Sequence, residues 1–442
     1  TPNNSKLMKN TLKMLKKGFR PVVVVILRWE AKLVLKKYKP KIIGVTGSVG
    51  KTSTKDAIYE VTKNYLSVSK SEKSYNSADI GVALTILGCQ SAWYSILGWL
   101  DIFFHGLFLI IFKKDYPKWL VLEIGVEYPG EIAQIVKWVK FDHAVVTFLP
   151  DMPVHVEFFS SPAEVIKEKM LLAKAVPAQG KVLINADDKN VAAHLGGIKG
   201  EILTFGFNDL ADYRAEAQGV LYDETGLPSG LTFKFEHNGK SLPVRVGGVV
   251  GEHQIYPVLA ALALGDILGV NVIEMIEVLK DYKPAAGRLR VLPGLKNSVV
   301  LDDTYNSSPA AVAAGLKTLS LLQVKGRRIA VLGDMLQLGT YAPEAHREIG
   351  YLAAEVCDLV YTVGLRSKFI DEVFIEKGLG EKVRHFDDSL SAGQTLQNEI
   401  EAGDVILVKG SQSMRMEKTV VEIMAEPDKK EKLLVRQEAE WL

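Results

Sequence analysis

The chain has 442 residues, more than one ordinary hydrophobic core holds, so two or three domains are expected. Hydrophobic residues make up 48% and charged residues 24%, which is typical of a folded protein and excludes a disordered one. The net charge of +2 gives no reason to expect a nucleic-acid partner. Cys89 and Cys357 lack metal-ligand spacing and favour a reducing, cytoplasmic compartment.

The first forty residues join a basic stretch, KLMKNTLKMLKKGFR, to a short apolar run, PVVVVIL. Arg28 and Glu30 end this run well before the ~20 residues that a membrane-spanning helix needs. A small-x-small cleavage site does not follow it, so a secretion signal is not indicated. We expect residues 1–40 to form a basic amphipathic helical segment that is loosely packed or faces a membrane.

From residue 41 onward, apolar runs typical of buried strands alternate with helical stretches. The first four runs are KIIGVT, WLVLEIG, HAVVTFL and KVLINAD. This alternation predicts a mostly parallel sheet covered by helices. The later runs LTFKFE and LPVRVG alternate apolar with polar residues, so we expect an antiparallel patch attached to the same domain.

A second strand and helix series follows KPAAGR, a linker-like stretch at 283–288. Its strands are predicted in SVVLDDTYN, RRIAVLGDM, LVYTVG and DVILVKGS. The chain is therefore expected to be α/β, with an N-terminal segment over 1–40, a central domain over 41–285 and a Rossmann-like C-terminal domain over 286–442.

The stretch GVTGSVGKTST at 44–54 links a predicted strand to a predicted helix. Free backbone N–H groups and the positive helix end meet at such a turn, where a phosphate fits. Val45 replaces the first glycine of the general phosphate-loop pattern, which leaves a narrower variant; the competing interpretation is a glycine turn with a surface lysine. In this central ATPase domain, the candidate nucleotide-binding residues are Gly47, Ser48, Gly50, Lys51, Thr52 and Ser53.

Ten motifs in order resemble those of the Mur ligase family, ATP-dependent enzymes that form amide bonds in peptidoglycan precursors. They are TGSVGKTSTK, SYNSADIGVALTIL, LEIGVEYPGEI, VHVEFF, NADD, GEHQIYPVLAALA, GRLRV, LDDTYNSSP, VLGDMLQLG and LVKGSQSMRME. The resemblance implies an ATPase domain followed by a Rossmann-like domain. It also implies ligation through an acyl phosphate, most similar to the branch that adds D-alanyl-D-alanine to UDP-N-acetylmuramoyl-tripeptide.

Several residues of the central domain acquire roles from this resemblance. Lys51 would hold the terminal phosphates and Thr52 would bind Mg²⁺. Glu123 matches a glutamate that binds Mg²⁺, and a carboxylate within WLVLEIG is costly to bury without a cation. His155 matches a ligand of a second Mg²⁺, against the simpler interpretation of a core or surface histidine. Lys169 matches a lysine that is carbamylated to bind metal.

In the second domain, Arg288 matches an arginine that reaches ATP phosphate when the domains close. Asp303 and Asn306, or Asp302 if the register slips by one residue, match the segment that contacts the ribose or base. The alternative for DDTYN is a turn rich in Asx residues. Lys409, Ser411 and Arg415 would face the amine substrate or the acyl phosphate.

Two departures from the family pattern keep the substrate open. Gln254 and Pro257 stand where the family has asparagines, which affects contacts near the adenine. The forty residues before the ATPase do not correspond to the family's UDP-sugar-binding domain. The alternatives are therefore the same chemistry on a lipid-linked or non-muramoyl acceptor, and a nucleotide-binding scaffold without ligase activity.

The segment 91–112, SAWYSILGWLDIFFHGLFLIIF, is predicted to be a helix with one broad apolar face. Asp101 and His105 argue against a membrane-spanning helix. A buried helix, a homodimer contact and a peripheral membrane contact remain as alternatives; the last is supported by Lys113, Lys114 and the basic N-terminal segment. The predicted face holds Trp93, Ile96, Leu97, Leu100, Phe103, Phe104, Leu107, Phe108 and Ile111.

Overall fold

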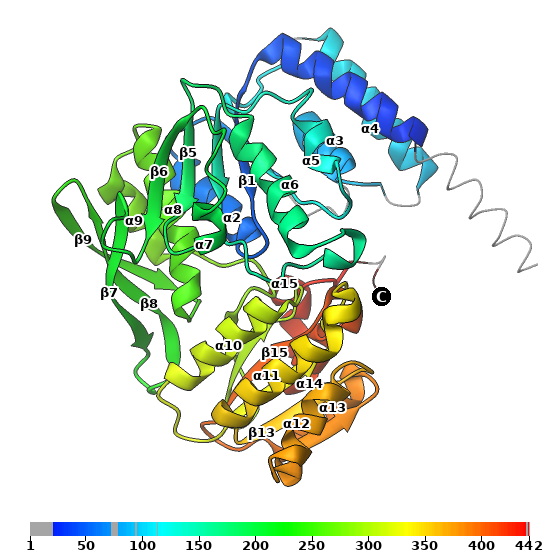
Figure 1. The fold of residues 1–442 in the computed structure, drawn as a ribbon, viewed down its shortest axis with the longest axis vertical. Coiled ribbons are helices and arrows are strands. Elements are labelled where there is room, and N and C mark those ends of the chain that lie inside the picture. Colours follow the sequence, from blue (N-terminus) through cyan, green and yellow to red (C-terminus); the bar gives the residue numbers. More distant parts are fainter. Residues whose placement is uncertain (1–20, 72–77, 93–94, 113, 439–440, 442) are drawn as a thin grey trace, which may run out of the picture.

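A computed structural model describes residues 21–71, 78–92, 95–112, 114–438 and 441. The described residues form two sheets flanked by helices, one around β1 in the upper half of Figure 1 and one around β13 and β15 in the lower half. This arrangement confirms the predicted fold class. The expected boundary near residue 286 falls between the last helix of the upper part and the first strand of the lower sheet.

The first sheet has nine strands in the order β2-β3-β1-β4-β5-β6-β7-β8-β9, so β1 lies between β3 and β4. Strands from β2 to β7 pair in parallel, whereas β7, β8 and β9 pair antiparallel, as expected for the appended patch. The bounds are β1 Lys41–Thr46, β2 Val68–Lys70, β3 Trp119–Glu123, β4 His143–Val146, β5 Lys181–Asn185, β6 Glu201–Gly206, β7 Tyr213–Tyr222, β8 Pro228–His237 and β9 Lys240–Gly247.

Helices cover both faces of this sheet because successive strand residues point to opposite sides. Ile42 packs on one side with α3, α4, α5 and α6, and Ile43 packs on the other with α2, α8 and α9. The helix bounds are α2 Lys51–Thr62, α3 Ala78–Leu87, α4 Ile96–Ile111, α5 Glu131–Ile135, α6 Pro162–Lys174, α7 Lys189–Ala192, α8 Ile255–Ile267 and α9 Val272–Lys280.

The second sheet has six strands in the order β10-β11-β15-β12-β13-β14, parallel except for the β10 and β11 pair. Helices α10, α11 and α12 pack on one face, and α13 and α14 on the other. The bounds are β10 Arg290–Pro293, β11 Val299–Asp303, β12 Arg328–Gly333, β13 Leu359–Val363, β14 Val383–Phe386, β15 Val405–Lys409, α10 Pro309–Leu321, α11 Ala342–Val356, α12 Lys368–Glu376, α13 Ser389–Glu399, α14 Glu417–Ile423 and α15 Lys430–Leu433.

The N-terminal segment is helical over residues 21–38 and packs beside α4 (Figure 1). Val23, Leu27 and Val34 are buried in the first core, so this part of the segment is not loosely packed, contrary to one of the two expectations. Residues 1–20 lie outside the described residues. Among the described helices, none has the length and apolar character needed to cross a bilayer.

Helix α4 is buried on one side only, so the first of the three alternatives, a buried helix, does not describe it. Trp99, Ile102 and Leu109 face the core. Trp93 of the predicted apolar face lies outside the described residues. The positions of this face that remain exposed to solvent are Leu97, Leu100, Phe104, Phe108 and Ile111.

Glu30 packs against Gly106 of α4. Its burial leads us to expect that the stability of the protein depends on pH. The residue is 1% exposed, and burial raises the pKa of its carboxyl group from 4.5 to about 7. The folded state therefore holds a proton that the unfolded chain releases, and the free energy of unfolding falls as the pH rises through this window. Glu30→Gln should make that fall smaller than in the wild type, as measured by urea unfolding at several pH values between 4.5 and 7. An unchanged pH dependence in the variant would contradict the assignment.

Candidate active site

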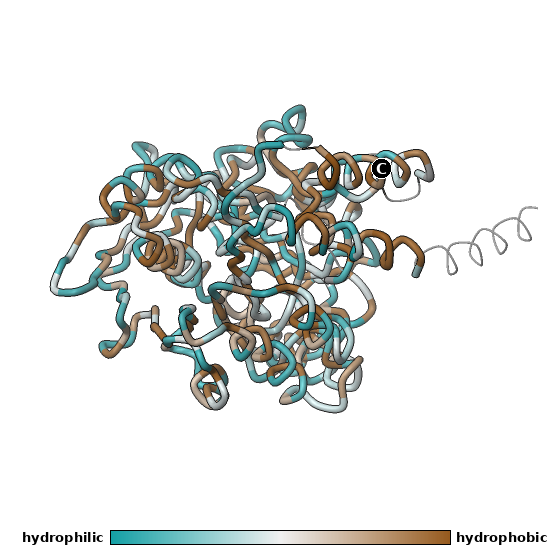
Figure 2. Tube along the Cα trace, turned by 90° about the horizontal axis from the view of Figure 1, so that it is seen from above, coloured by the Kyte–Doolittle hydropathy of each residue, from teal (hydrophilic) through white to brown (hydrophobic). Residues whose placement is uncertain are grey.

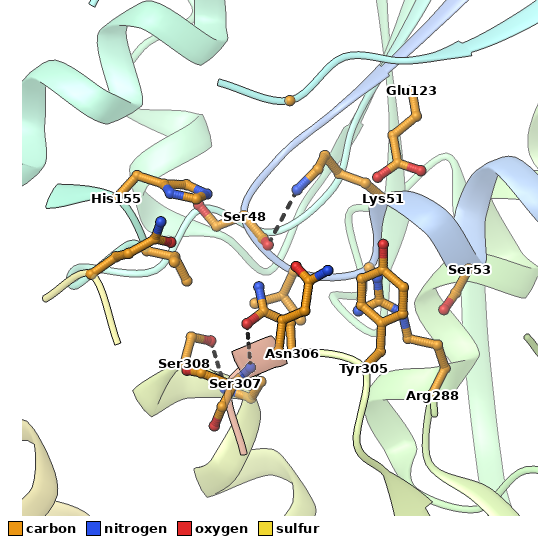
Figure 3. A pocket seen from close by; sticks show the side chains of 18 of the residues that line it. Ser48, Lys51, Ser53, Glu123, His155, Arg288, Tyr305, Asn306, Ser307 and Ser308 are labelled. Carbon is orange, nitrogen blue, oxygen red and sulfur yellow. Dashed lines mark hydrogen bonds between the residues drawn. The ribbon is translucent and has the colours of Figure 1, made fainter. Parts of the chain in front are cut away.

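A cavity of about 460 Å³ lies between the two sheets and is lined by residues from both. The loop after β1, the end of β3 and the segment before α6 form one wall; the loops after β11 and β15 form the other. In Figure 3, Lys51 and His155 face Tyr305 and Asn306 across the opening. The carboxyl ends of parallel strands from two domains thus meet at one site, where α/β folds bind ligands.

The loop after β1 has the backbone of a phosphate-binding turn. Gly47 has φ 141°, and a Cβ there would lie 1.9 Å from the Thr147 hydroxyl, so a larger residue does not fit. Gly50, with φ 87°, is the N-cap of α2. The first N–H groups of a helix lack partners within that helix, so this end presents donors and positive potential to the cavity.

Lys51 extends into this cavity from the first residue of α2, and its ammonium Nζ lies 3.5 Å from the Ser48 carbonyl. Desolvation at this depth lowers the pKa of Lys51; nearby Glu123 opposes the shift and Arg288 adds to it. A phosphate placed here would restore the charge balance, because it would bring negative charge to a site rich in cations.

A hydrogen-bonded chain crosses from the second domain to the first. Arg288 donates through Nη2 to the Thr52 hydroxyl at 3.0 Å, and that hydroxyl donates to Glu123 Oε1 at 3.0 Å. The Arg288 guanidinium also stacks on Tyr305, 4.0 Å from its ring centroid. Hydroxyl and carboxylate oxygens beside a phosphate loop are the ligands that Mg²⁺ uses together with phosphate oxygens.

Lys169 approaches the same loop from α6. It is 2% exposed and donates to the Gly47 carbonyl at 3.0 Å and to the Ser48 hydroxyl at 2.9 Å. Burial, with a smaller contribution from Lys51, places its pKa well below the ordinary value. Its amine is therefore far more easily deprotonated than that of a surface lysine, as a reaction with CO₂ requires.

His155 lies at a left-handed backbone position with φ 72°. Burial, then Lys169 and Lys51, lower its pKa to about 3, so the imidazole is neutral at pH 7. Its Nδ1 is buried and makes no hydrogen bond with the described residues. A neutral ring nitrogen of this kind can bind a metal. However, no group of three or more His, Cys, Asp or Glu residues is arranged for a metal ion in the described chain.

The two aspartates of the DDTYN stretch have different surroundings. Asp302 points inward, accepts from the Gly287 N–H at 3.0 Å and has a pKa raised by burial to about 6. Asp303 and Asn306 line the cavity, and Asp303 pairs with Lys409 at 2.7 Å. Asp303 therefore lines the cavity, whereas Asp302 is buried behind it and bonds to the backbone; contact of Asp303 with the ribose or base stays a prediction.

The three residues expected on the substrate side occupy different positions. Lys409 and Ser411 line the cavity, and Lys409 is held by Asp303 and by the Asn306 carbonyl at 2.9 Å. Arg415 is not among the described residues that line it. Its guanidinium instead binds Glu417 and the Trp441 carbonyl at 2.7 Å.

The end of the chain folds back to this site, a feature that the sequence did not reveal. Arg436 is buried, pairs with Glu417 at 2.6 Å and donates to the Thr304 carbonyl at 2.6 Å and the Tyr305 carbonyl at 3.0 Å. Trp441 lines the cavity. Tyr305 was within reach of sequence reasoning because it lies inside the LDDTYNSSP motif; Trp441 carried no such signal.

Fold and site together define a phosphate-loop nucleotide-binding protein whose site is completed by a second α/β domain. The chain belongs to the Mur ligase family. The profile of the Mur ligase middle domain matches residues 45–265, and that of the Mur ligase, glutamate ligase domain matches residues 287–412.

Individual relatives agree with this membership. UDP-N-acetylmuramoyl-tripeptide--D-alanyl-D-alanine ligase of Bacillus subtilis is 27% identical over 398 residues, which cover 90% of this chain and 79% of the relative. The enzyme of the same name from Escherichia coli is 29% identical, with 86% and 76% covered. The crystal structure of MurF ligase from Thermotoga maritima in complex with ADP has a TM-score of 0.75 and 27% identity, with 92% and 84% covered.

Arg436→Ala should destabilise the second domain because it leaves the buried Glu417 carboxylate without one of its two guanidinium partners. The free energy of unfolding is expected to fall by about 3 kcal/mol, as measured by urea denaturation. Arg347→Ala is the matched control: it removes an arginine that also pairs with two glutamates, but at the surface. Equal effects of the two substitutions would contradict the stabilising role assigned to the buried pair of Arg436 and Glu417.

Proposed function

We propose that this protein is an ATP-dependent ligase that joins D-alanyl-D-alanine to a muramoyl-tripeptide precursor of peptidoglycan through an acyl phosphate. The observation that carries the proposal is the convergence of Lys51 from the first domain and Arg288 from the second on Thr52 and Glu123. The relatives that bear this activity by name support the choice of substrates.

The chemistry explains why cations gather here. A carboxylate is a poor electrophile, so one of its oxygens first attacks the γ-phosphorus of ATP and ADP leaves. The amine then attacks the carbonyl carbon of the acyl phosphate, loses a proton, and inorganic phosphate leaves. Both steps move a highly charged phosphoryl group, and positioning and electrostatic stabilisation supply most of the catalysis.

The residues of the first domain that line the cavity or contact its phosphate loop each have a role in this scheme. The N–H groups of the 47–50 loop and Lys51 hold the phosphates. Thr52 and Glu123 would hold one Mg²⁺, which would supply positive charge beside the phosphoryl oxygens. His155 and a carbamate on Lys169 would hold a second Mg²⁺. The carbamate forms when the neutral amine attacks CO₂ and releases a proton, and the lowered pKa of Lys169 supports that assignment.

The second domain supplies the remaining contacts. Arg288 reaches the phosphates beside Thr52, and Asp303 and Asn306 contact the ribose or base. Lys409 and Ser411 would contact the acyl phosphate or the amine; both line the cavity, and Arg415 donates to the carbonyl of Trp441, which also lines it.

We also infer a cytoplasmic location at the inner face of the membrane. Both cysteines are free of disulfides, and ATP is available in the cytoplasm. The exposed apolar side of α4 supports the membrane side of this inference.

The activity is tested by ADP release from purified protein with ATP, Mg²⁺, UDP-N-acetylmuramoyl-tripeptide and D-alanyl-D-alanine, each peptide substrate being omitted in turn. ADP release should require both substrates. Lys51→Ala should lower the rate of ADP release by about a thousandfold, because the variant lacks the ammonium group that would bind the phosphates. Lys63→Ala, at the far end of α2, should not lower it. ATP binding without substrate-dependent ADP would favour a scaffold, and ADP release with only a lipid-linked or non-muramoyl acceptor would identify a different ligase.

Lys169→Ala should reduce ligase activity by at least about a hundredfold if a carbamate holds the second Mg²⁺. Bicarbonate should not restore the variant, since the amine that would carry the carbamate is gone. Lys167→Ala is the matched control, because Lys167 lies two residues away on the same helix but is exposed. Wild-type activity in Lys169→Ala, or equal losses in both variants, would contradict the metal role of Lys169.

A further inference from the structure

Helix α4 presents a continuous apolar stripe to solvent on the side away from the core. Its residues are spaced by three or four positions, so they lie along one side of the helix. The exposed fractions are 79% for Leu97, 45% for Leu100, 68% for Phe104, 47% for Phe108 and 67% for Ile111. Single exposed apolar residues are common, but five in one row mark an interaction surface.

The stripe is held firmly in this orientation. Trp99, Ile102 and Leu109 anchor the opposite side of α4 in the core. Lys37 donates to the Leu109 carbonyl at 2.9 Å and the Ile110 carbonyl at 3.0 Å, and so fixes the C-terminal end. A rotation that buried the stripe would expose the core residues instead, so α4 keeps the stripe on the surface.

The neighbouring helix adds a second exposed apolar side. Val22, Val25 and Trp29 are 54%, 67% and 52% exposed, and Lys32 and Lys36 continue the same helical row. Both helices lie at one edge of the molecule (Figure 1), and much of their trace is brown in Figure 2. A row that passes from apolar to basic residues suits the boundary between acyl chains and anionic headgroups.

The positive charge near the stripe favours an anionic lipid bilayer, and not a second copy of the chain, as its partner. Residues 1–20 contain six Lys or Arg and no Asp or Glu, and the row that follows them ends in Lys32 and Lys36. A second copy of this chain would bring Lys32 and Lys36 close to their own like charges, whereas an anionic bilayer attracts both these lysines and the stripe. No described helix is suited to crossing a membrane, so the contact would be peripheral.

We propose that the stripe of α4, together with Val22, Val25 and Trp29, docks this protein on an anionic lipid bilayer. Docking would hold the ligase site beside the membrane, where a lipid-linked precursor or the next membrane-bound reaction could be reached. The surface proposal does not depend on the ligase activity, since it concerns residues outside the cavity.

The test is flotation of the full chain with phosphatidylcholine vesicles that contain either no phosphatidylglycerol or about 30% of it. The protein should float with the anionic vesicles only. Phe104→Ser/Phe108→Ser should reduce the bound fraction at least about tenfold. Leu97→Ser/Ile111→Ser, which changes the two ends of the stripe, should reduce the bound fraction as well. This second variant keeps the test decisive if the first one fails to fold.

The matched control is Leu210→Ser/Leu365→Ser, which removes apolar side chains that are 90% and 75% exposed elsewhere on the surface. It should float like the wild type. Failure of the wild type to float, or flotation of the stripe variants at the wild-type level, would overturn the proposal. So would a dimer in sedimentation velocity without vesicles that the stripe variants dissociate, since it would show that a second copy covers the stripe.

Discussion

Positive charge around the phosphate loop is the constraint on which the rest of the site depends. Lys51, Lys169 and Arg288 come from three different elements, and the pKa values of both lysines are lowered where they lie. Gathering desolvated cations in this way costs stability unless an anion joins them. The cost is understandable if the ligand is a polyphosphate with Mg²⁺, whose charge the site is arranged to receive.

The same constraint explains why two domains are needed. The first domain supplies the loop, Glu123 and Lys169, whereas Arg288 lies at the start of the second domain and stacks on Tyr305 of that domain. Arg436, near the end of the chain, donates to the Tyr305 carbonyl and is itself held by an ion pair with Glu417. A side chain near the end of the sequence is therefore connected, through Tyr305, to a cation close to the phosphate loop.

Much of this was predictable from the sequence because it depends on local periodicity. Strands β1, β3, β4 and β5 and the loop at 47–50 follow from apolar runs and glycine spacing. The choice between Asp302 and Asp303 needed the structure, since adjacent strand residues point to opposite sides. The exposure of the α4 stripe and the return of Trp441 depend on tertiary packing, for which a single sequence carries no local signal. Short, polar β14 was missed for a related reason: its strand character comes from pairing with β13.

The central claim, that this site transfers phosphate to a carboxylate before an amine attacks, is tested most directly with an acceptor whose reacting carboxylate carries oxygen-18. The label on the attacking oxygen should appear in the inorganic phosphate, one atom for each amide bond formed, because the bond that breaks in the second step joins that oxygen to the acyl carbon. Amide formation with unlabelled phosphate would contradict the acyl phosphate and, with it, the purpose assigned here to the cations around Lys51.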